Sequence, residues 1–308
     1  MKRNYIAVLL ILVLLLPGCG KSVSDNANII VTDSEGTKIQ MEHKPQRVAV
    51  LLSSFADIWL SAGGKIDITV GESVERGFVD DSVILVDAGA GKTIDVEALI
   101  AARPDFVIGS ADIPAQCNVV TMCKDVGIPA GLFRVESFED YLQVLKTFTQ
   151  ITGNHDNFIR YGSDLQAQID TLISDFQASG DTQRVLFIRS GSSARSMKAK
   201  STKDHFACGM LKELGVINIA DAAPILLDNL STEQILLSDP DYILISTMGD
   251  ETAAKEYTKS VFSQPQWQAL RSIRNNNVVY LPKELFQYKP NARWADAYQQ
   301  LISILTNK

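Results

Sequence analysis

A cluster of basic side chains has the most evident chemistry in this sequence. Between Arg189 and His205 there are six basic residues, counting the histidine, and one acidic residue, Asp204. The whole chain has a formal net charge of −7, so the segment contrasts with an acidic background. Guanidinium groups bind carboxylates and phosphates through paired hydrogen bonds, and we therefore expect an anionic ligand here. A solvated charged loop is the alternative.

His205 is the histidine that falls in this segment. Imidazole is a common metal ligand, which makes His205 a candidate axial ligand for a haem iron or a corrinoid cobalt. An ordinary helix-end histidine is the alternative. His43 precedes the first predicted buried strand and His155 begins a predicted long helix, so the sequence does not predict the converging set of ligands that a bare metal ion requires.

The motifs that would indicate catalysis are incomplete. Residues 89–93 (GAGKT) are similar to a phosphate-binding loop, but that motif requires a glycine where this chain has Val86. Residues 191–195 (GSSAR) lack the glycine that closes a serine nucleophile elbow. We therefore predict no enzymatic activity and no cofactor. The negative net charge also argues against nucleic acid as a partner, because phosphate backbones bind basic surfaces.

The first residues have the pattern of an export signal. Lys2 and Arg3 precede an apolar run, Ile6 to Leu16, of 11 residues, which is shorter than the roughly 20 residues of a membrane-spanning helix. The run ends in Leu16-Pro17-Gly18-Cys19, which resembles a bacterial lipobox. We predict a signal peptide at 1–18, acyl chains such as palmitate on Cys19 and a flexible spacer at 19–27. The mature protein would then be extracytoplasmic and lipid-anchored to the cell membrane. An ordinary secretory signal is the alternative.

Three further cysteines follow Cys19. Cys117 and Cys123 are close enough in sequence to form a disulfide in an oxidising compartment, although they do not have to. Cys208 is left without a predicted role.

Unbroken apolar runs predict the strands that would position these residues. Such runs are typical of parallel strands that are covered on both faces, and amphipathic helical stretches separate them, so the pattern is that of an α/β fold. An earlier alternating stretch, 28–41, surrounds a turn sequence and predicts a hairpin. The buried runs are Val48–Leu52, Phe106–Ile108, Val185–Ile188, Tyr242–Ile245 and Val278–Leu281.

An internal repeat indicates two similar lobes. Residues 93–110 align without gaps on residues 229–246, and each copy predicts a short helix, a Pro-Asp turn and a buried strand. Between the copies, apolar residues at helical spacing predict one long helix from His155 to Ala178. We therefore predict two Rossmann-like lobes with mainly parallel sheets, at 28–152 and 181–308, joined by a single long helix within 153–180.

Several segments together resemble the class III substrate-binding proteins of ABC importers, which deliver ferric siderophores, haem and cobalamin. The similarity covers nearly the whole mature chain, and it includes both copies of the repeat. The matching segments outside the repeat are 45–48 (PQRV), 209–220 (GMLKELGVINIA) and 288–294 (YKPNARW).

The resemblance implies partners and two docking residues. In that family an acidic residue on each repeat helix pairs with arginines of the permease, and by position these are Glu97 and Glu233. A carboxylate favoured in the first turn of a helix is the alternative. The implied partners are an ABC permease and its ATPase, with the chain itself a monomer.

The resemblance also implies a ligand in the cleft between the lobes, where the carboxyl ends of strands meet loops. The ligand would be a ferric siderophore, haem or cobalamin. Two alternatives stay open: a lipoprotein sensor or adhesin that uses the same cleft, and a protein that binds free metal ions. The cleft candidates are Ser53, Ser54, Phe55, Glu72, Arg76, Phe78 and the 89–92 loop with Lys92 in the first lobe, and Arg189, Arg195, Met197, Lys198, Lys200, His205, Met248, Phe286, Tyr288 and Arg293 in the second.

Overall fold

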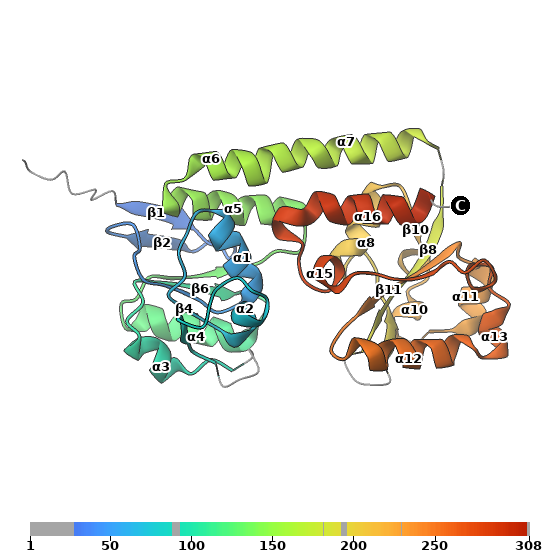
Figure 1. The fold of residues 1–308 in the computed structure, drawn as a ribbon, viewed down its shortest axis with the longest axis horizontal. Helices are drawn as coiled ribbons and strands as arrows, with labels where there is room; N and C mark the ends of the chain where they lie inside the picture. The colour runs from blue at the N-terminus through green and yellow to red at the C-terminus, as the bar shows by residue number, and fades with distance from the viewer. Residues whose placement is uncertain (1–27, 88–92, 181, 192–195, 229, 307–308) are drawn as a thin grey trace, which may run out of the picture.

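The computed structural model describes residues 28–87, 93–180, 182–191, 196–228 and 230–306. The predicted signal peptide, Cys19 and the spacer lie outside these ranges, as do Lys92 and Arg195. Figure 1 shows two lobes side by side, each with a sheet and surrounding helices, with one helical segment running along both. No helix in the described ranges combines the length and apolar content that crossing a membrane requires.

The N-terminal lobe contains a parallel sheet in the order β5-β4-β3-β6-β7. Every residue of β3 and β6 is buried, as expected for strands with helices on both faces. The strands are β3 (Val48–Val50), β4 (Ile68–Thr69), β5 (Ile84–Leu85), β6 (Phe106–Ser110) and β7 (Ala130–Phe133). The helices are α1 (Ser53–Ser61), α2 (Gly71–Glu75), α3 (Val96–Ala101), α4 (Pro114–Asp125) and α5 (Phe138–Thr152).

The predicted hairpin is present and precedes this sheet. Strands β1 (Ile29–Thr32) and β2 (Lys38–Met41) pair antiparallel. The Asp33 carboxylate accepts hydrogen bonds from the main-chain amides of Glu35 and Thr37, at 3.1 and 2.9 Å. This side chain therefore fixes the turn between the two strands.

The C-terminal lobe has a similar sheet, in which four strands repeat the order β4-β3-β6-β7. Its sheet runs β10-β8-β11-β12 in parallel, with β9 added antiparallel to β8. The strands are β8 (Arg184–Ser190), β9 (Met197–Ala199), β10 (Ile217–Asn218), β11 (Tyr242–Thr247) and β12 (Val278–Tyr280). The helices are α8 (Phe206–Glu213), α9 (Ile219–Ala222), α10 (Ile225–Asp228), α11 (Thr232–Ser238), α12 (Glu251–Phe262), α13 (Pro265–Gln268), α14 (Arg271–Arg274), α15 (Lys283–Phe286), the 3₁₀ turn η2 (Asn291–Arg293) and α16 (Trp294–Thr306).

The two copies of the repeat fold alike. One forms α3 and β6, and the other forms α11 and β11. Each helix ends near a residue in the left-handed region, Arg103 at φ 52° and Asp239 at φ 38°, which precedes the Pro-Asp turn. The predicted fold of two lobes with mainly parallel sheets is confirmed, and these equivalent turns show that the repeat extends to backbone geometry.

The helical segment between the lobes differs in detail from the regular helix that the sequence predicts. It consists of α6 (His155–Phe158), a π-helical turn η1 (Ile159–Ser163) and α7 (Asp164–Ala178). Figure 1 shows α7 lying along α16, the last helix of the chain. The apolar spacing fixes which face is buried, but it does not distinguish a π-helical turn from an α-helical one.

One apolar core extends through both lobes. It includes Val50 and Phe106 from the first sheet and Phe187 and Leu244 from the second, together with Trp294 at the start of α16. Side chains of α7 and α16 belong to the same cluster. The lobes therefore share buried surface, and burial of such surface is the main stabilising contribution to folding.

Cys117 and Cys123 are not bridged. Both thiols are free, and the two residues lie on one helix, α4. A six-residue separation turns their side chains to different sides of the helix, so this geometry excludes the disulfide that the sequence left open. Cys208 is also free, and it is buried.

Candidate binding site between the lobes

A cavity of about 220 Å³ lies where the C-terminal segment crosses the first lobe. The N-terminal lobe forms one side of the cavity, mostly with residues at or just after the carboxyl ends of β3, β4, β6 and β7. Ligands usually bind at this end of the strands in open parallel sheets. The C-terminal segment that follows α15 closes the other side. The lining residues are Leu52, Ser54, Phe55, Ile58, Glu72, Ser110, Asp112, Val135, Gln287, Tyr288, Lys289 and Asn291.

A polar network adjoins this cavity at Glu72. Ser53, at the start of α1, donates a hydrogen bond from Oγ to the Glu72 carboxylate, and Arg76 Nη1 donates to the same Ser53 oxygen at 3.0 Å. Burial lowers the pKa of Arg76, and the nearby Asp57 and Glu72 carboxylates partly oppose this. The guanidinium group is therefore held in place while it is only partly hydrated.

Arg76 also joins the two lobes. Its guanidinium carbon lies 4.1 Å from the centre of the Tyr288 ring and 4.6 Å from that of Phe78, within cation–π range. Tyr288 comes from the C-terminal segment, and Arg76 and Phe78 come from the first lobe. The structure thus brings together three of the predicted cleft residues as one cationic and aromatic surface.

Asn291 fixes the C-terminal segment to α1. Its side chain is fully buried, its backbone is left-handed at φ 53°, and its Nδ2 donates to the Ser54 carbonyl and to Asp57 Oδ2, both at 2.9 Å. Burial raises the pKa of Asp57, and the hydrogen bond from Asn291 opposes this. Sequence reasoning missed Asp57 and Asn291 as a pair, because 234 residues separate them.

The second lobe presents Arg189 and Met248 together. Arg189 lies near the carboxyl end of β8 and Met248 directly follows the neighbouring β11, and Arg189 Nη2 lies 2.8 Å from Met248 Sδ. Burial lowers the pKa of Arg189, with the Glu136 carboxylate opposing. Arg189 Nε is buried and has no hydrogen-bond partner among the described residues. A buried donor without a partner is costly, so an acceptor on a ligand would stabilise this side chain.

His205 fits the second reading of the sequence, an ordinary helix-end histidine, and it does not line the cavity. Its ring is 7% exposed and packs on Phe187 and Phe206, and its Nδ1 accepts a hydrogen bond from the Ala207 amide at 3.2 Å. Burial is the main cause that lowers the pKa of His205, to about 3. This neutral imidazole caps α8, and its burial leaves no access for the iron or cobalt ligation that was the other reading.

Phe286 is also wrongly assigned to the cleft. Its side chain is 0% exposed and belongs to the shared core, and its carbonyl accepts a hydrogen bond from Ser246 Oγ at 3.2 Å. A ligand could contact this ring only after the core around it had opened.

Several other candidates lie apart from the cavity. Met197 and Lys198 line a separate space of about 480 Å³ beside Trp267 of α13. Arg293 is exposed and pairs with Asp296 at 3.0 Å. The proposed docking residues Glu97 and Glu233 are both exposed in the first turns of α3 and α11.

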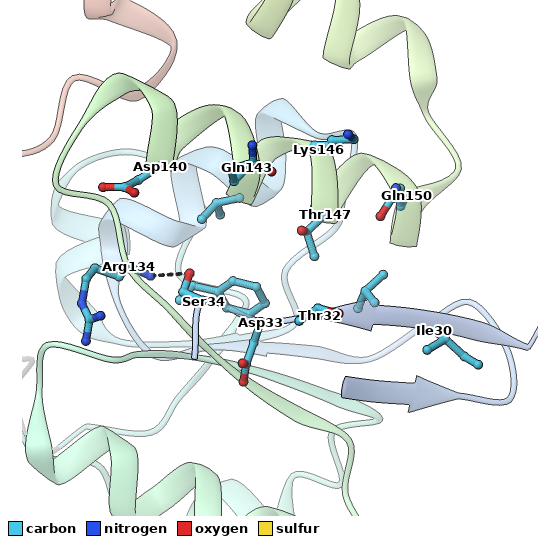
Figure 2. A pocket seen from close by; sticks show the side chains of 13 residues that line it. Ile30, Thr32, Asp33, Ser34, Arg134, Asp140, Gln143, Lys146, Thr147 and Gln150 are labelled. Carbon is cyan, nitrogen blue, oxygen red and sulfur yellow. Dashed lines mark hydrogen bonds between the residues drawn. The ribbon is translucent and has the colours of Figure 1, made fainter. Parts of the chain in front are cut away.

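A larger hollow of about 520 Å³ lies elsewhere on the first lobe, between the hairpin and α5. Figure 2 shows side chains of Gln143, Thr147 and Gln150 on α5 above Ser34 and Asp33 of the hairpin. Two of its polar side chains make structural hydrogen bonds. Asp33 fixes the hairpin turn, and Ser34 Oγ accepts a hydrogen bond from the Arg134 amide at 3.0 Å. We therefore place the candidate site in the cavity between the lobes. Among the described residues, no three His, Cys, Asp or Glu side chains converge as metal ligands.

Comparisons with known proteins point to one family. A family model described as "Periplasmic binding protein" matches residues 48–285. The Bacillus subtilis protein YhfQ, provisionally named an ABC transporter substrate-binding lipoprotein, is 21% identical, and the match covers 96% of each chain.

Solved structures of two Vibrio cholerae proteins have the same fold. The periplasmic catecholate-siderophore binding protein VctP is 16% identical with a TM-score of 0.69, covering 91% of this chain and 100% of its own. The periplasmic haem-binding protein HutB is 18% identical with a TM-score of 0.66, covering 85% of this chain and 99% of its own.

Proposed function

This chain belongs to the periplasmic binding protein family, and on that premise we propose that it is an extracytoplasmic receptor for an ABC importer. It would bind a ferric siderophore, haem or cobalamin between its lobes and deliver this ligand to the permease, with no catalytic step. The observation that carries the proposal is the cavity between the lobes, at the carboxyl ends of parallel strands, beside which Arg76 stacks on Tyr288.

Tyr288 at the cavity, with Arg76 and Phe78 next to it and Arg189 on the second lobe, suits a flat anionic ligand. Phe78 and Tyr288 both offer aromatic surface next to the Arg76 guanidinium, and the buried Arg189 Nε has no acceptor among the residues that the structure describes. Aromatic rings can cover a catecholate or a macrocycle, and guanidinium groups can pair with carboxylates or phosphates. This combination favours a metal chelate with excess negative charge.

The size of the cavity implies movement on binding. Its volume of about 220 Å³ is below the roughly 300–1,000 Å³ of sites for drug-sized ligands, so the lobes or their loops must separate to admit a chelate. The shared core and the helical segment between the lobes would limit this to a small hinge motion.

The tether forms part of the proposed mechanism. Lipid on Cys19 and the spacer at 19–27 would hold the receptor near its permease and raise the effective concentration for docking. Glu97 and Glu233 would then pair with basic residues of the permease, and the receptor would act as a monomer.

Tryptophan fluorescence tests the ligand class. The three tryptophans are all buried, and Trp294 begins the helix that directly follows the segment at the cavity. We expect submicromolar quenching on titration with haem, with cobalamin or with one of several ferric siderophores. No response to any of them, together with binding of free zinc or manganese, would overturn the proposal.

A further inference from the structure

The two repeat helices expose the same positions to solvent. Ile100 on α3 and Leu236 on α11 are both 37% exposed, and Leu237 is 76% exposed. Each follows an exposed glutamate by three or four residues, and the equivalent Ala101 is exposed as well. We name these residues the repeat-helix patch: Glu97, Ile100 and Ala101 on α3, with Glu233, Leu236 and Leu237 on α11.

Helical spacing explains why the residues of the patch adjoin one another on each helix. Residues three and four apart lie on one face of a helix, so each glutamate adjoins the apolar residues one turn later. Leu99 and Ile235 attach the two helices to their lobes. Both side chains are 0% exposed, and each packs into an apolar cluster of its own lobe. Burial and exposure therefore alternate identically in the two helices.

The glutamates of the patch are available to a partner. Among the described residues, no ion pair or hydrogen bond involves the Glu97 or Glu233 side chain. In contrast, the two aspartates of the Pro-Asp turns are both engaged by main-chain amides. The repeat thus uses the aspartate of each Pro-Asp turn for its own fold and leaves the glutamate of each helix facing solvent.

Single exposed apolar residues are common on soluble proteins. Here, however, the same exposure recurs at equivalent positions of two lobes. The residue types differ, with Ile100 opposite Leu236 and Ala101 opposite Leu237, while the apolar character is kept. One partner that contacts both lobes in the same way must itself present two copies of one site, each with a cation beside an apolar pocket.

We propose that Ile100 and Leu236, the latter with Leu237, are the apolar anchors of the interface with a two-fold symmetric membrane permease. Each anchor occupies a pocket whose rim carries the cation that pairs with the preceding glutamate. Burying the anchor excludes water from that ion pair, which strengthens it. This inference rests on the proposed function, and it adds the apolar half of the docking surface.

Substitution of the anchors tests the inference. The full chain is titrated against its permease–ATPase complex in lipid nanodiscs, as wild type, Ile100→Ser and Leu236→Ser. We expect each substitution to weaken binding about tenfold, as loss of an interface anchor does. Ile159→Ser is the matched control, because Ile159 is 44% exposed but lies in η1, in the helical segment that Figure 1 shows along the opposite side of the molecule from α3.

A double substitution separates this role from a structural one. If Ile100 strengthens the Glu97 ion pair, Glu97→Gln with Ile100→Ser should weaken binding by less than the product of the two single effects. Ligand quenching should be unchanged in every variant, which shows that the fold is intact. Simple multiplication of the two effects would overturn the coupling between anchor and glutamate.

The outcomes distinguish this inference from the proposed function. Wild-type binding that neither serine variant weakens would overturn the anchors and leave the receptor function standing. An effect at only one of the two helices would overturn the symmetric interface. Absence of wild-type binding to the permease complex would overturn the proposed function itself.

Discussion

Asp105 and Arg47 exchange hydrogen bonds at the start of the first sheet. The Asp105 carboxylate accepts from the Arg47 amide at 2.8 Å, and the Asp105 amide donates to the Arg47 carbonyl at 2.9 Å. Asp241 and Arg184 form the same pair in the second lobe, at 2.9 and 2.8 Å. Each pair fixes the register of two neighbouring parallel strands, which explains why the Pro-Asp turn occurs in both copies of the repeat.

Asp105→Ala should destabilise the protein by about 1–3 kcal/mol, because two main-chain amides lose their charged acceptor. These are the amides of Gln46 and Arg47. Urea unfolding of the purified protein measures the change. Asp81→Ala is the control, since Asp81 is exposed and should change stability by less than about 0.5 kcal/mol. Equal stability of the two variants would contradict the structural role of the Pro-Asp turn.

His205 should make the protein less stable in mild acid. Its pKa in the folded protein is about 3, below the ordinary value of 6.5, so the unfolded chain binds the extra proton between these values. The contribution of the neutral His205 to stability is therefore fully present above pH 6.5 and is lost as the pH falls towards 3. The free energy of unfolding decreases by no more than about 1.4 kcal/mol per pH unit from this group.

His205→Asn removes this titration while keeping a side-chain acceptor at the start of α8. The difference in unfolding free energy between wild type and variant should therefore change between pH 6.5 and pH 3. A difference that is constant across this range would show that the imidazole is not neutral in the folded protein.

Asp57 should have the opposite pH effect from a carboxylate held in a favourable ion pair. Burial raises its pKa above 3.8, so between 3.8 and the raised value the folded protein binds more protons than the unfolded chain. Stability then falls as pH rises through this window. Asp57→Asn keeps an acceptor for Asn291 and should be more stable than wild type at pH 7, with the gain disappearing below pH 3.8. Lower stability of this variant at pH 7 would mean that Arg76 and Arg293 outweigh the cost of burial.

The aromatic ring of Tyr288 should contribute to ligand affinity. Tyr288→Ala removes the surface over which the Arg76 guanidinium lies, and we expect about tenfold weaker ligand binding in the fluorescence titration, since cation–π contacts contribute about 0.5–2 kcal/mol. Tyr288→Phe keeps the ring and should bind within about twofold of wild type. Equal losses in the two variants would assign the effect to the hydroxyl group instead.

Charge reversal should separate docking from ligand binding. Glu97→Lys with Glu233→Lys is expected to abolish uptake of the labelled ligand by cells, because each lysine would repel the basic residues proposed for the permease. Ligand affinity should stay unchanged, since both residues lie outside the cavity between the lobes. Loss of affinity in the purified variant would show that these glutamates act on the ligand.

The sequence predicts the parts of the fold that leave local patterns. Unbroken apolar runs indicate β3, β6, β8, β11 and β12, and the hairpin has a clear turn sequence. The two-residue strands β4, β5 and β10 are too short to show any periodicity. The π-helical turn in the segment between the lobes has no distinguishing pattern either.

The site is less predictable because it depends on where side chains point. Arg76 and Tyr288 are two of the predicted cleft residues, and the guanidinium carbon of Arg76 lies 4.1 Å from the centre of the Tyr288 ring. His205 and Phe286 also follow the carboxyl ends of strands, yet both turn into the core. The contact between Asn291 and Asp57 depends on the C-terminal segment crossing to α1, which local sequence does not encode.

That crossing has a consequence for how the molecule melts. Asn291 attaches the end of the chain to the first lobe, and a single apolar core continues from one sheet to the other. Neither half can lose its structure without uncovering apolar surface of its neighbour, so both should denature in one calorimetric transition despite their similar architecture. A half expressed by itself would expose that surface and aggregate, even though the repeat suggests two independent modules.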